Sequence, residues 1–273
     1  MSGAAARAAL LRRNPTRSAA LRSTTVLILL PPSEGKAELG DGPTLDLSRL
    51  SFPSLTASRK KVLSALTALC RKSRAQAQAV LGLSPGQLGE IGKNRELRTA
   101  PTLTAAELYT GVLYDNLDLA SLPPDAAERA ARSLLIFSGL WGVLRITDRV
   151  PPYRLSMGVR LPPLGGLAAQ WRKPITPVLD AEPGLVVDLR SSTYATAWQP
   201  GARAVGVRVL KDGKVVSHMA KATRGVIARS LLENGVDPQT PQELAKVLDS
   251  LGHAVALGPA PTGGRPWTLD VTA

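Results

Sequence analysis

Cysteine and histidine are scarce in this chain, and each shortage excludes a class of protein. A single cysteine, Cys70, excludes an intramolecular disulfide framework and a CxxC metal site, so we expect a reducing cytoplasm. The two histidines, His218 and His253, supply too few ligands for a zinc or iron centre. The sequence therefore predicts no metal site and no cofactor.

Long hydrophobic runs and aromatic residues are also few. The longest run of large aliphatic residues, 26–30, is far shorter than the roughly 20 residues of a membrane-spanning helix, so no membrane partner is expected. Only four Trp, four Tyr and two Phe occur, which argues against a stacking platform for single-stranded nucleic acid. With 273 residues, 44% of them hydrophobic, the chain can still bury a sizeable core.

Acidic residues are outnumbered, with 21 Asp and Glu against 34 Lys and Arg, for a net charge of +13. This excess favours an anionic partner such as nucleic acid or a phosphorylated metabolite. Part of it comes from residues 1–25, which contain five Arg and no acid. We expect this basic extension to be disordered, or a misassigned start with translation beginning near Val26.

Hydrophobic periodicity and turn signals predict a mixed α+β fold. A strand over 26–30 should lead into the loop Pro31–Lys36, and an amphipathic helix should cover 58–81. Capping-box spacing predicts further helix starts at Ser84, Thr104 and Thr240, and a looser variant at Asp125 begins a helix towards Phe137.

The second half of the chain has more strand signals. Strands are expected over 185–189 and 202–210, with a hairpin at Lys211–Lys214 and a helix over 221–233. A last strand is expected over 253–257, and the Pro- and Gly-rich tail 259–273 has no clear order. We therefore expect a single α+β domain over 26–258, with a helix-rich first half and a strand-rich second half.

The central stretch 138–158 combines small residues with charged and phenolic side chains. Arg145 and Arg154 are suited to a bidentate grip on phosphate or carboxylate. The alternative is an internal ion-pair network in which Asp148 neutralises one of these two arginines. The residues alone do not decide between a site and a scaffold.

A family resemblance bears on that choice. Ser138–Arg145 together with Pro152–Gly158 resembles the signature of the YaaA family of bacterial peroxide-stress proteins. Supporting matches occur in the same order as in the family, at Pro32, Ser33 and Lys36, Tyr109–Gly111, Ser191–Tyr194, Lys221, Arg224–Gly225 and Arg229. The loop Pro-Ser-Glu-Gly-Lys is longer than the family's commoner Ser-Pro-Ala-Lys, and the N-terminal extension is outside the resemblance.

The resemblance implies a cytoplasmic protein that protects against peroxide, takes part in iron homeostasis by limiting iron-driven damage, and binds DNA. It also implies a helix-hairpin-helix-like element and one fold with a basic cleft. On this basis the cleft residues are expected to be Lys36, Arg145, Asp148, Tyr153, Arg154, Ser191, Tyr194, Lys221, Arg224 and Arg229. Because metal ligands are scarce, any effect on iron should be indirect.

The best candidate for the DNA-binding element is Leu81–Arg95. Gly86 and Gly89 would let a duplex backbone approach closely, and Lys93 and Arg95 would supply charge without reading bases. A glycine-rich connection between helices is common, so without the resemblance an ordinary helical connection is the favoured interpretation of the segment.

An enzyme acting on a phosphorylated or nucleotide-like small molecule is the competing hypothesis. Ser33 could be a nucleophile activated by Lys36, with Tyr153 as an acid or base. Alternatively, Ser33 only caps its turn and Lys36 is a surface charge. Convergence of these side chains on a closed pocket would favour the enzyme, and an open groove of duplex width would favour DNA.

Overall fold

A mixed eight-stranded sheet forms the centre of the molecule. The computed structural model describes residues 26–38, 40–211, 213–215 and 219–272. The strand order is β11-β12-β9-β8-β1-β3-β4, with β10 paired to β9. The strands are β1 Leu27–Leu30, β3 Leu134–Ser138, β4 Gly142–Leu144, β8 Val186–Asp188, β9 Ala204–Lys211, β10 Lys214–Val215, β11 Ala254–Leu257 and β12 Trp267–Thr272. The expected mixed α and β fold is confirmed.

Helices and short sheets surround this sheet. The α-helices are α1 Thr56–Lys72, α2 Arg74–Leu81, α3 Gly89–Arg95, α4 Ala105–Leu108, α5 Val112–Leu117, α6 Pro124–Ser133, α7 Leu167–Asp180, α8 Ser192–Ala195, α9 Met219–Asn234 and α10 Pro241–Ser250. The 3₁₀ turns are η1 Pro53–Leu55, η2 Pro85–Gln87, η3 Leu119–Ser121 and η4 Gly201–Arg203. Two small antiparallel sheets pair β2 Leu103–Thr104 with β5 Arg149–Val150, and β6 Arg160–Leu161 with β7 Gly165–Gly166.

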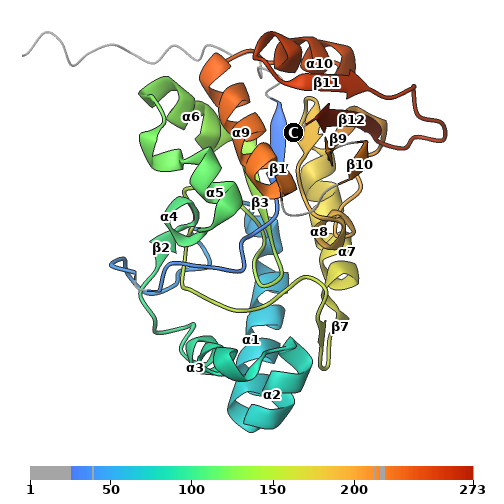
Figure 1. Ribbon diagram of the computed structural model, residues 1–273. Coiled ribbons are helices and arrows are strands. Elements are labelled where there is room, and N and C mark those ends of the chain that lie inside the picture. Colours follow the sequence, from blue (N-terminus) through green and yellow to red (C-terminus); the bar gives the residue numbers. More distant parts are fainter. Residues whose placement is uncertain (1–25, 39, 212, 216–218, 273) are drawn as a thin grey trace, which may run out of the picture.

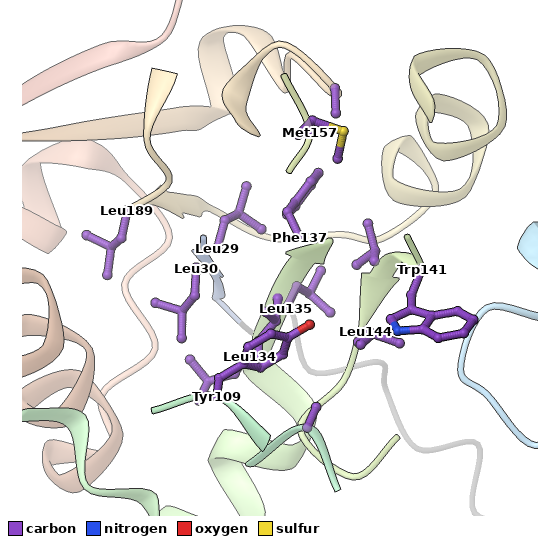
Figure 2. Packing of buried hydrophobic residues seen from close by; sticks show 14 of the residues in the cluster. Leu29, Leu30, Tyr109, Leu134, Leu135, Phe137, Trp141, Leu144, Met157 and Leu189 are labelled. Atoms are coloured by element: carbon purple, nitrogen blue, oxygen red, sulfur yellow. The ribbon is translucent and has the colours of Figure 1, made fainter. Parts of the chain in front are cut away.

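The layers explain why the central strands β1 and β3 are apolar except for Ser138. Helices α5, α6 and α9 lie together on one side of β1 and β3, with α7 and α8 on the other side, while α1, α2 and α3 group at one end (Figure 1). Every residue of β1 and of β3 is buried. A parallel strand covered on both faces has no solvent face to supply with polar residues. Figure 2 shows Leu29 and Leu30 of β1 beside Phe137 of β3 within this core.

Three of the four predicted helix starts are present, whereas α6 begins at Pro124 with Pro123 as its N-cap, so Asp125 lies inside the first turn. The Thr104 hydroxyl accepts a hydrogen bond from the backbone N–H of Glu107, whose carboxylate accepts one from the Thr104 N–H. The Thr240 hydroxyl accepts from the N–H of Glu243 at the start of α10. Ser84 begins the 3₁₀ turn η2, with Gln87 closing the capping box.

Two predicted helices are too long. The helix expected over 58–81 breaks at Ser73, whose extended backbone and side chain begin α2 by accepting from the N–H of Gln76. Serine is a good N-cap, and the apolar spacing conceals the break because it continues across it. The helix expected to run towards Phe137 ends at Ser133, because Leu134–Ser138 is completely buried as strand β3.

The C-terminal part contains a strand that the sequence did not predict. The expected strand near 253–257 is present as β11, but it is not the last. Residues Trp267–Thr272 form β12, which pairs parallel with β9 and antiparallel with β11, in the segment interpreted as a tail without order. Strands β9 and β10 pair antiparallel, with Lys211 opposite Lys214. Asp212 of the predicted hairpin and the extension 1–25 lie outside the described residues.

The strand order creates a switch point between β1 and β8, where the chain connections lead in opposite directions. From β1 the chain proceeds to β3 on one side, whereas β8 lies on the other side of β1 and leads away to β9. All four of these strands are parallel, so the connections diverge between the carboxyl ends of β1 and β8. In open α/β sheets, such a divergence leaves a crevice where ligands bind.

Candidate functional site

A cavity of about 370 Å³ lies where β1 and β8 end. It is lined by the loop that follows β1, the start of α5, the segment 154–156, the residues after β8, and the first turns of α9. Its charged lining residues are Glu34, Lys36, Arg154, Lys221 and Arg224. Its size falls within the range of small-molecule sites. We call it the switch-point cavity.

The loop after β1 is fastened to the segment before α5. Ser33 donates its hydroxyl to the Gly35 carbonyl and accepts from the N–H of Thr110 at 3.1 Å. The backbones of Lys36 and Tyr109 form a β-bridge. Lys36 Nζ donates to the Ser33 carbonyl at 2.8 Å, not to its hydroxyl. Ser33 therefore stabilises the turn, and the expected pair of a serine nucleophile and a lysine base is not formed.

Lys36 is not a surface charge, which was the alternative interpretation from the sequence. Its Nζ lies 4.6 Å from the centroid of the Tyr153 ring and 5.6 Å from that of Tyr109. Burial, and then the nearby Arg154 guanidinium, lower the pKa of Lys36 to about 8. This amine therefore loses its proton more readily than an exposed lysine does.

Beneath Lys36 lies a chain of buried hydroxyl groups. The Tyr109 and Tyr153 hydroxyls are 2.9 Å apart, and the Tyr153 hydroxyl is 2.7 Å from Ser138 Oγ. Ser138 Oγ accepts from the N–H groups of Leu140 and Trp141. Because Ser138 Oγ has its lone pairs occupied in this way, its proton is directed to Tyr153. Burial raises the pKa of both tyrosines, so both phenols stay protonated.

All four tyrosines of the chain gather around this site. Tyr114 and Tyr194 line the switch-point cavity, and the Tyr114 ring stacks on Tyr109 with centroids 5.5 Å apart. The Tyr114 hydroxyl donates to the Pro31 carbonyl at 2.8 Å, and the Tyr194 hydroxyl accepts from the N–H of Met157. In a chain with so few aromatic residues, this concentration is the clearest mark of a specialised region.

Arg154 is positioned by a buried asparagine. Asn94 of α3 is fully buried, and its side chain accepts from the Arg154 N–H at 3.0 Å and donates to the Arg154 carbonyl at 2.9 Å. The guanidinium reaches Glu34 at 3.4 Å. Asn94 thus joins helix α3 to the cavity wall.

Helix α9 brings two cations to the cavity by packing closely on α5. A Cβ on Gly225 would lie 2.2 Å from the Leu113 carbonyl oxygen, so only glycine permits this approach. The neighbouring Arg224 has a buried Nε with no hydrogen-bond partner among the described residues. Burial lowers the pKa of Arg224, with Asp188 acting in the opposite direction. Lys221 is exposed at the cavity edge.

Three expected cleft residues lie elsewhere. Arg145 donates to the Arg132 carbonyl and stacks on Phe52, and Asp148 accepts from the N–H groups of Ser51 and Arg145. Arg229 binds the carbonyls of Leu117 and Asp118 and pairs with Glu233. These three side chains hold secondary-structure elements together and do not line the switch-point cavity. The structure brings together Lys36, Arg154, Ser191, Tyr194, Lys221 and Arg224, with Tyr153 beneath Lys36.

The expected DNA-backbone residues lie on and beside α3. Gly86 and Gly89 face open space. Lys93 pairs with Glu90 at 2.9 Å and Glu38 at 3.6 Å, while Arg95 Nε donates to the Cys70 carbonyl at 2.7 Å. A second cavity of about 360 Å³ separates this element from the first, and both Lys36 and Arg154 line each of them.

Other singled-out residues belong to the core. Cys70 is buried and its pKa is raised by desolvation, which suits a small hydrophobe and not a peroxide-reactive thiolate. Trp141, Trp171 and Trp198 are fully buried, and His218 lies outside the described residues. Among residues that the structure describes, no group of three or more His, Cys, Asp or Glu could hold a metal. No helix in that part of the chain is long and apolar enough to cross a membrane.

Sequence reasoning missed several contributors. Asn94 was passed over as one polar residue in a glycine-rich segment, although it is the link to Arg154. A buried ion pair between Asp188 and Arg190, 2.6 Å apart, fixes the end of β8, and the Arg190 guanidinium also lies over the Phe137 ring. Tyr114 has no sequence signal of its own, and that all four tyrosines converge is visible only once the chain is folded.

Comparisons with known proteins give the family. Residues 26–256 match the family model described as peroxide stress protein YaaA. A UPF0246 protein of Streptomyces coelicolor is 56% identical over 90% of this chain and 98% of its own length. UPF0246 proteins of Corynebacterium glutamicum and Corynebacterium efficiens are each 42% identical, over 86% and 90% of this chain and 96% and 99% of their own lengths. The chain therefore belongs to the family of the peroxide stress protein YaaA.

Proposed function

We propose that this peroxide stress protein acts in the cytoplasm by binding a small anionic molecule, phosphorylated or nucleotide-like, in the switch-point cavity. The observation that carries the proposal is the composition of the cavity wall. Lys36, Arg154, Lys221 and Arg224 line a space of small-molecule size, and Glu34 is the one acid among the lining residues. Arginine and lysine are the side chains that grip phosphate oxygens.

Two of these cations are prepared to bind before a ligand arrives. The Arg154 backbone is held by Asn94 from both sides, so its side chain starts from a fixed point. Arg224 carries a buried N–H without a partner in the described part of the chain, and such a group favours an anionic acceptor. Fixed donors cost less conformational entropy on binding than mobile surface lysines do.

The effect on iron-driven damage would then be indirect. The chain would sense, sequester or convert an anionic compound whose level changes under peroxide, because a direct iron site finds no ligand cluster in the described residues. Metal analysis of the purified protein tests this part. Stoichiometric iron would contradict it.

Calorimetric titration with adenosine 5′-monophosphate and with inorganic phosphate tests the binding. Arg154→Gln should weaken binding at least about tenfold, because a charge-assisted contact of about 1.5–3 kcal/mol is lost. Arg208→Gln is the matched control, since Arg208 is exposed on β9 and pairs with Asp270 at 2.7 Å. Binding that is equal in both variants would contradict the proposal.

A survival assay under hydrogen peroxide tests whether the switch-point cavity is needed for protection in the cell. In a strain that lacks this protein, Arg208→Gln should restore survival to the level of the unchanged chain, whereas Arg154→Gln should not. Restoration by both variants would mean that peroxide protection does not depend on the cavity.

Binding to the DNA duplex backbone is the second candidate function. It is favoured by the open space around Gly86, Gly89 and Gly92, where an external backbone could approach. Helix α1 contacts both α2 and α3 and adds the exposed cations Lys60, Lys61, Arg71 and Lys72 on the neighbouring surface. A duplex-binding assay over increasing salt should show a steep loss of affinity, and a flat salt titration would contradict this candidate.

A further inference from the structure

Lys36 has surroundings that anion binding alone does not require. One of its N–H groups is used by the Ser33 carbonyl, and two tyrosine rings lie on its apolar side. In the described part of the chain no carboxylate lies within ion-pair distance of Nζ, although Glu34 and Glu90 are close enough to influence its charge. An electrostatic anchor for phosphate is better served by a fully charged, solvated ammonium.

The same surroundings are those of a nucleophilic amine. A lysine becomes reactive when it is desolvated beside apolar groups and next to another cation, since both disfavour the ammonium form. Burial of Lys36 supplies the first condition and Arg154 supplies the second, and together they outweigh the attraction of the Tyr109 and Tyr153 ring faces for the ammonium. The lowered pKa of Lys36, about 8, agrees with this geometry.

We propose that Lys36 Nζ forms an imine with the aldehyde or ketone group of a phosphorylated small molecule whose phosphate is bound by Arg154, Lys221 and Arg224. This inference rests on the proposed anion-binding function and adds the reactive group of the ligand. All four side chains line the one cavity, so a single compound can meet the amine and the three other cations together.

The chemical step is balanced without an oxidant or a reductant. The nitrogen lone pair attacks the carbonyl carbon, the carbonyl π electrons move to the oxygen, and a proton passes from the nitrogen to that oxygen through the solvent to give a carbinolamine. The hydroxyl then leaves as water with a proton from the solvent, a carbon–nitrogen double bond forms, and the nitrogen returns its remaining proton to the solvent. The buried hydroxyls of Tyr109, Tyr153 and Ser138 are satisfied by one another and position the rings below the amine.

Borohydride trapping tests the proposal on the full chain. The protein is mixed with pyridoxal 5′-phosphate as a phosphorylated aldehyde probe, reduced with sodium borohydride, digested and mapped by mass spectrometry. The reduced adduct should concentrate on Lys36 over all other lysines. Pyridoxal, which lacks the phosphate, should label Lys36 at least about tenfold less, and excess inorganic phosphate should suppress the labelling.

Two variants keep the result interpretable. Lys36→Arg retains the positive charge but cannot form an imine, so its adduct should disappear while circular dichroism shows an unchanged fold. Lys93→Arg is the matched control, because Lys93 lines the second cavity and is paired with Glu90. Its adduct at Lys36 should persist.

The outcomes separate this inference from the function on which it rests. Labelling spread evenly over surface lysines, together with phosphate binding by calorimetry, would overturn the imine and leave the anion site standing. Equal labelling of Lys36 by pyridoxal and by its phosphate, with no protection by inorganic phosphate, would overturn the phosphorylated ligand and count against the anion site as well. Selective, phosphate-dependent labelling of Lys36 supports both.

Discussion

Lys36 and Lys93 both line the cavity of about 360 Å³, yet their environments shift their pKa values in opposite directions. Burial and the Arg154 guanidinium lower the pKa of Lys36 to about 8. A hydrogen bond to the Glu90 carboxylate, followed by the charges of Glu90 and Glu38, raises the pKa of Lys93. Lys36 therefore loses its proton more easily than an ordinary lysine, whereas Lys93 holds its proton more firmly.

The difference extends to the regions around them. The switch-point cavity is held by buried hydrogen bonds, such as those of Tyr153 with Tyr109 and Ser138. On α3, by contrast, Lys93 makes only partly exposed ion pairs, which contribute little to stability. Buried polar networks fix a geometry, whereas exposed charges mainly steer a partner. The comparison suggests precise small-ligand chemistry at the cavity and looser, long-range attraction at α3.

The largest expected effect is in amine reactivity. At pH 8 about half of Lys36 is neutral, which is on the order of 100-fold more than for a lysine at the usual pKa of 10.5. Competitive acetylation followed by mass spectrometry should therefore give a Lys36 curve rising through pH 8, and a Lys93 curve rising only at much higher pH.

The charges facing Lys36 give this test its controls. Arg154, and more weakly Lys93, lower the pKa of Lys36, while Glu90 and Glu34 raise it. Arg154→Gln should therefore move the Lys36 curve to higher pH, and Glu34→Gln should move it to lower pH. Lys36 and Lys93 curves that coincide would remove the basis of the comparison.

Glycine substitutions offer the next largest contrast. Gly225→Ala places a Cβ 2.2 Å from the Leu113 carbonyl oxygen and forces α9 away from α5, which should cost about 3 kcal/mol. Gly92→Ala in α3 meets open space and should stabilise the protein by about 0.5–1 kcal/mol, because alanine is the better helix former. Urea denaturation measures both, and equal effects would show that the helices repack around Gly225.

Much of the fold could be predicted because short-range signals were strong. The aliphatic run before Pro31 and the capping side chains of Thr104 and Thr240 act locally, and each is found as expected. The break at Ser73 was missed because a cap within a continuing apolar pattern changes no periodicity. Strand β12 was missed because its short apolar alternation follows a Pro- and Gly-rich stretch that is typical of a tail, and its pairing with the distant strand β9 leaves no local signal.

The site was only half predictable, for a physical reason. The family signature identified Lys36, Arg154 and Arg224, but it could not show that Arg145 and Asp148 are taken up by backbone contacts. The motif's glycine also serves packing, since a Cβ on Gly139 would lie 2.5 Å from the Leu155 carbonyl oxygen. A charged residue in a motif can bind a ligand or stabilise the fold, and only its burial and its hydrogen-bond partners in the structure distinguish the two roles.

Asn94 provides the next prediction, since it connects the two regions. Asn94→Ala leaves the N–H and the carbonyl of Arg154 without their partners and should cost about 2 kcal/mol of stability. It should also weaken adenosine 5′-monophosphate binding, because Arg154 loses its fixed starting point. Asn116→Ala is the control: Asn116 is exposed on α5, and among the described residues its one hydrogen bond is to the Val112 carbonyl of its own helix. If Asn94→Ala leaves ligand affinity unchanged, the regions are independent.

The smallest expected effect concerns α3 itself. Lys93→Gln removes one cation near the proposed duplex surface, so duplex affinity should fall a fewfold and the slope of log affinity against log salt should decrease by about 1. Adenosine 5′-monophosphate affinity should change less, because Lys93 does not line the switch-point cavity and is the weakest of the charges acting on Lys36. Arg154→Gln should show the reverse preference. If both variants reduced duplex and nucleotide binding in proportion, the two regions would form one continuous binding surface. Lys36 and Lys93 would then belong to a single site in spite of their opposite pKa shifts.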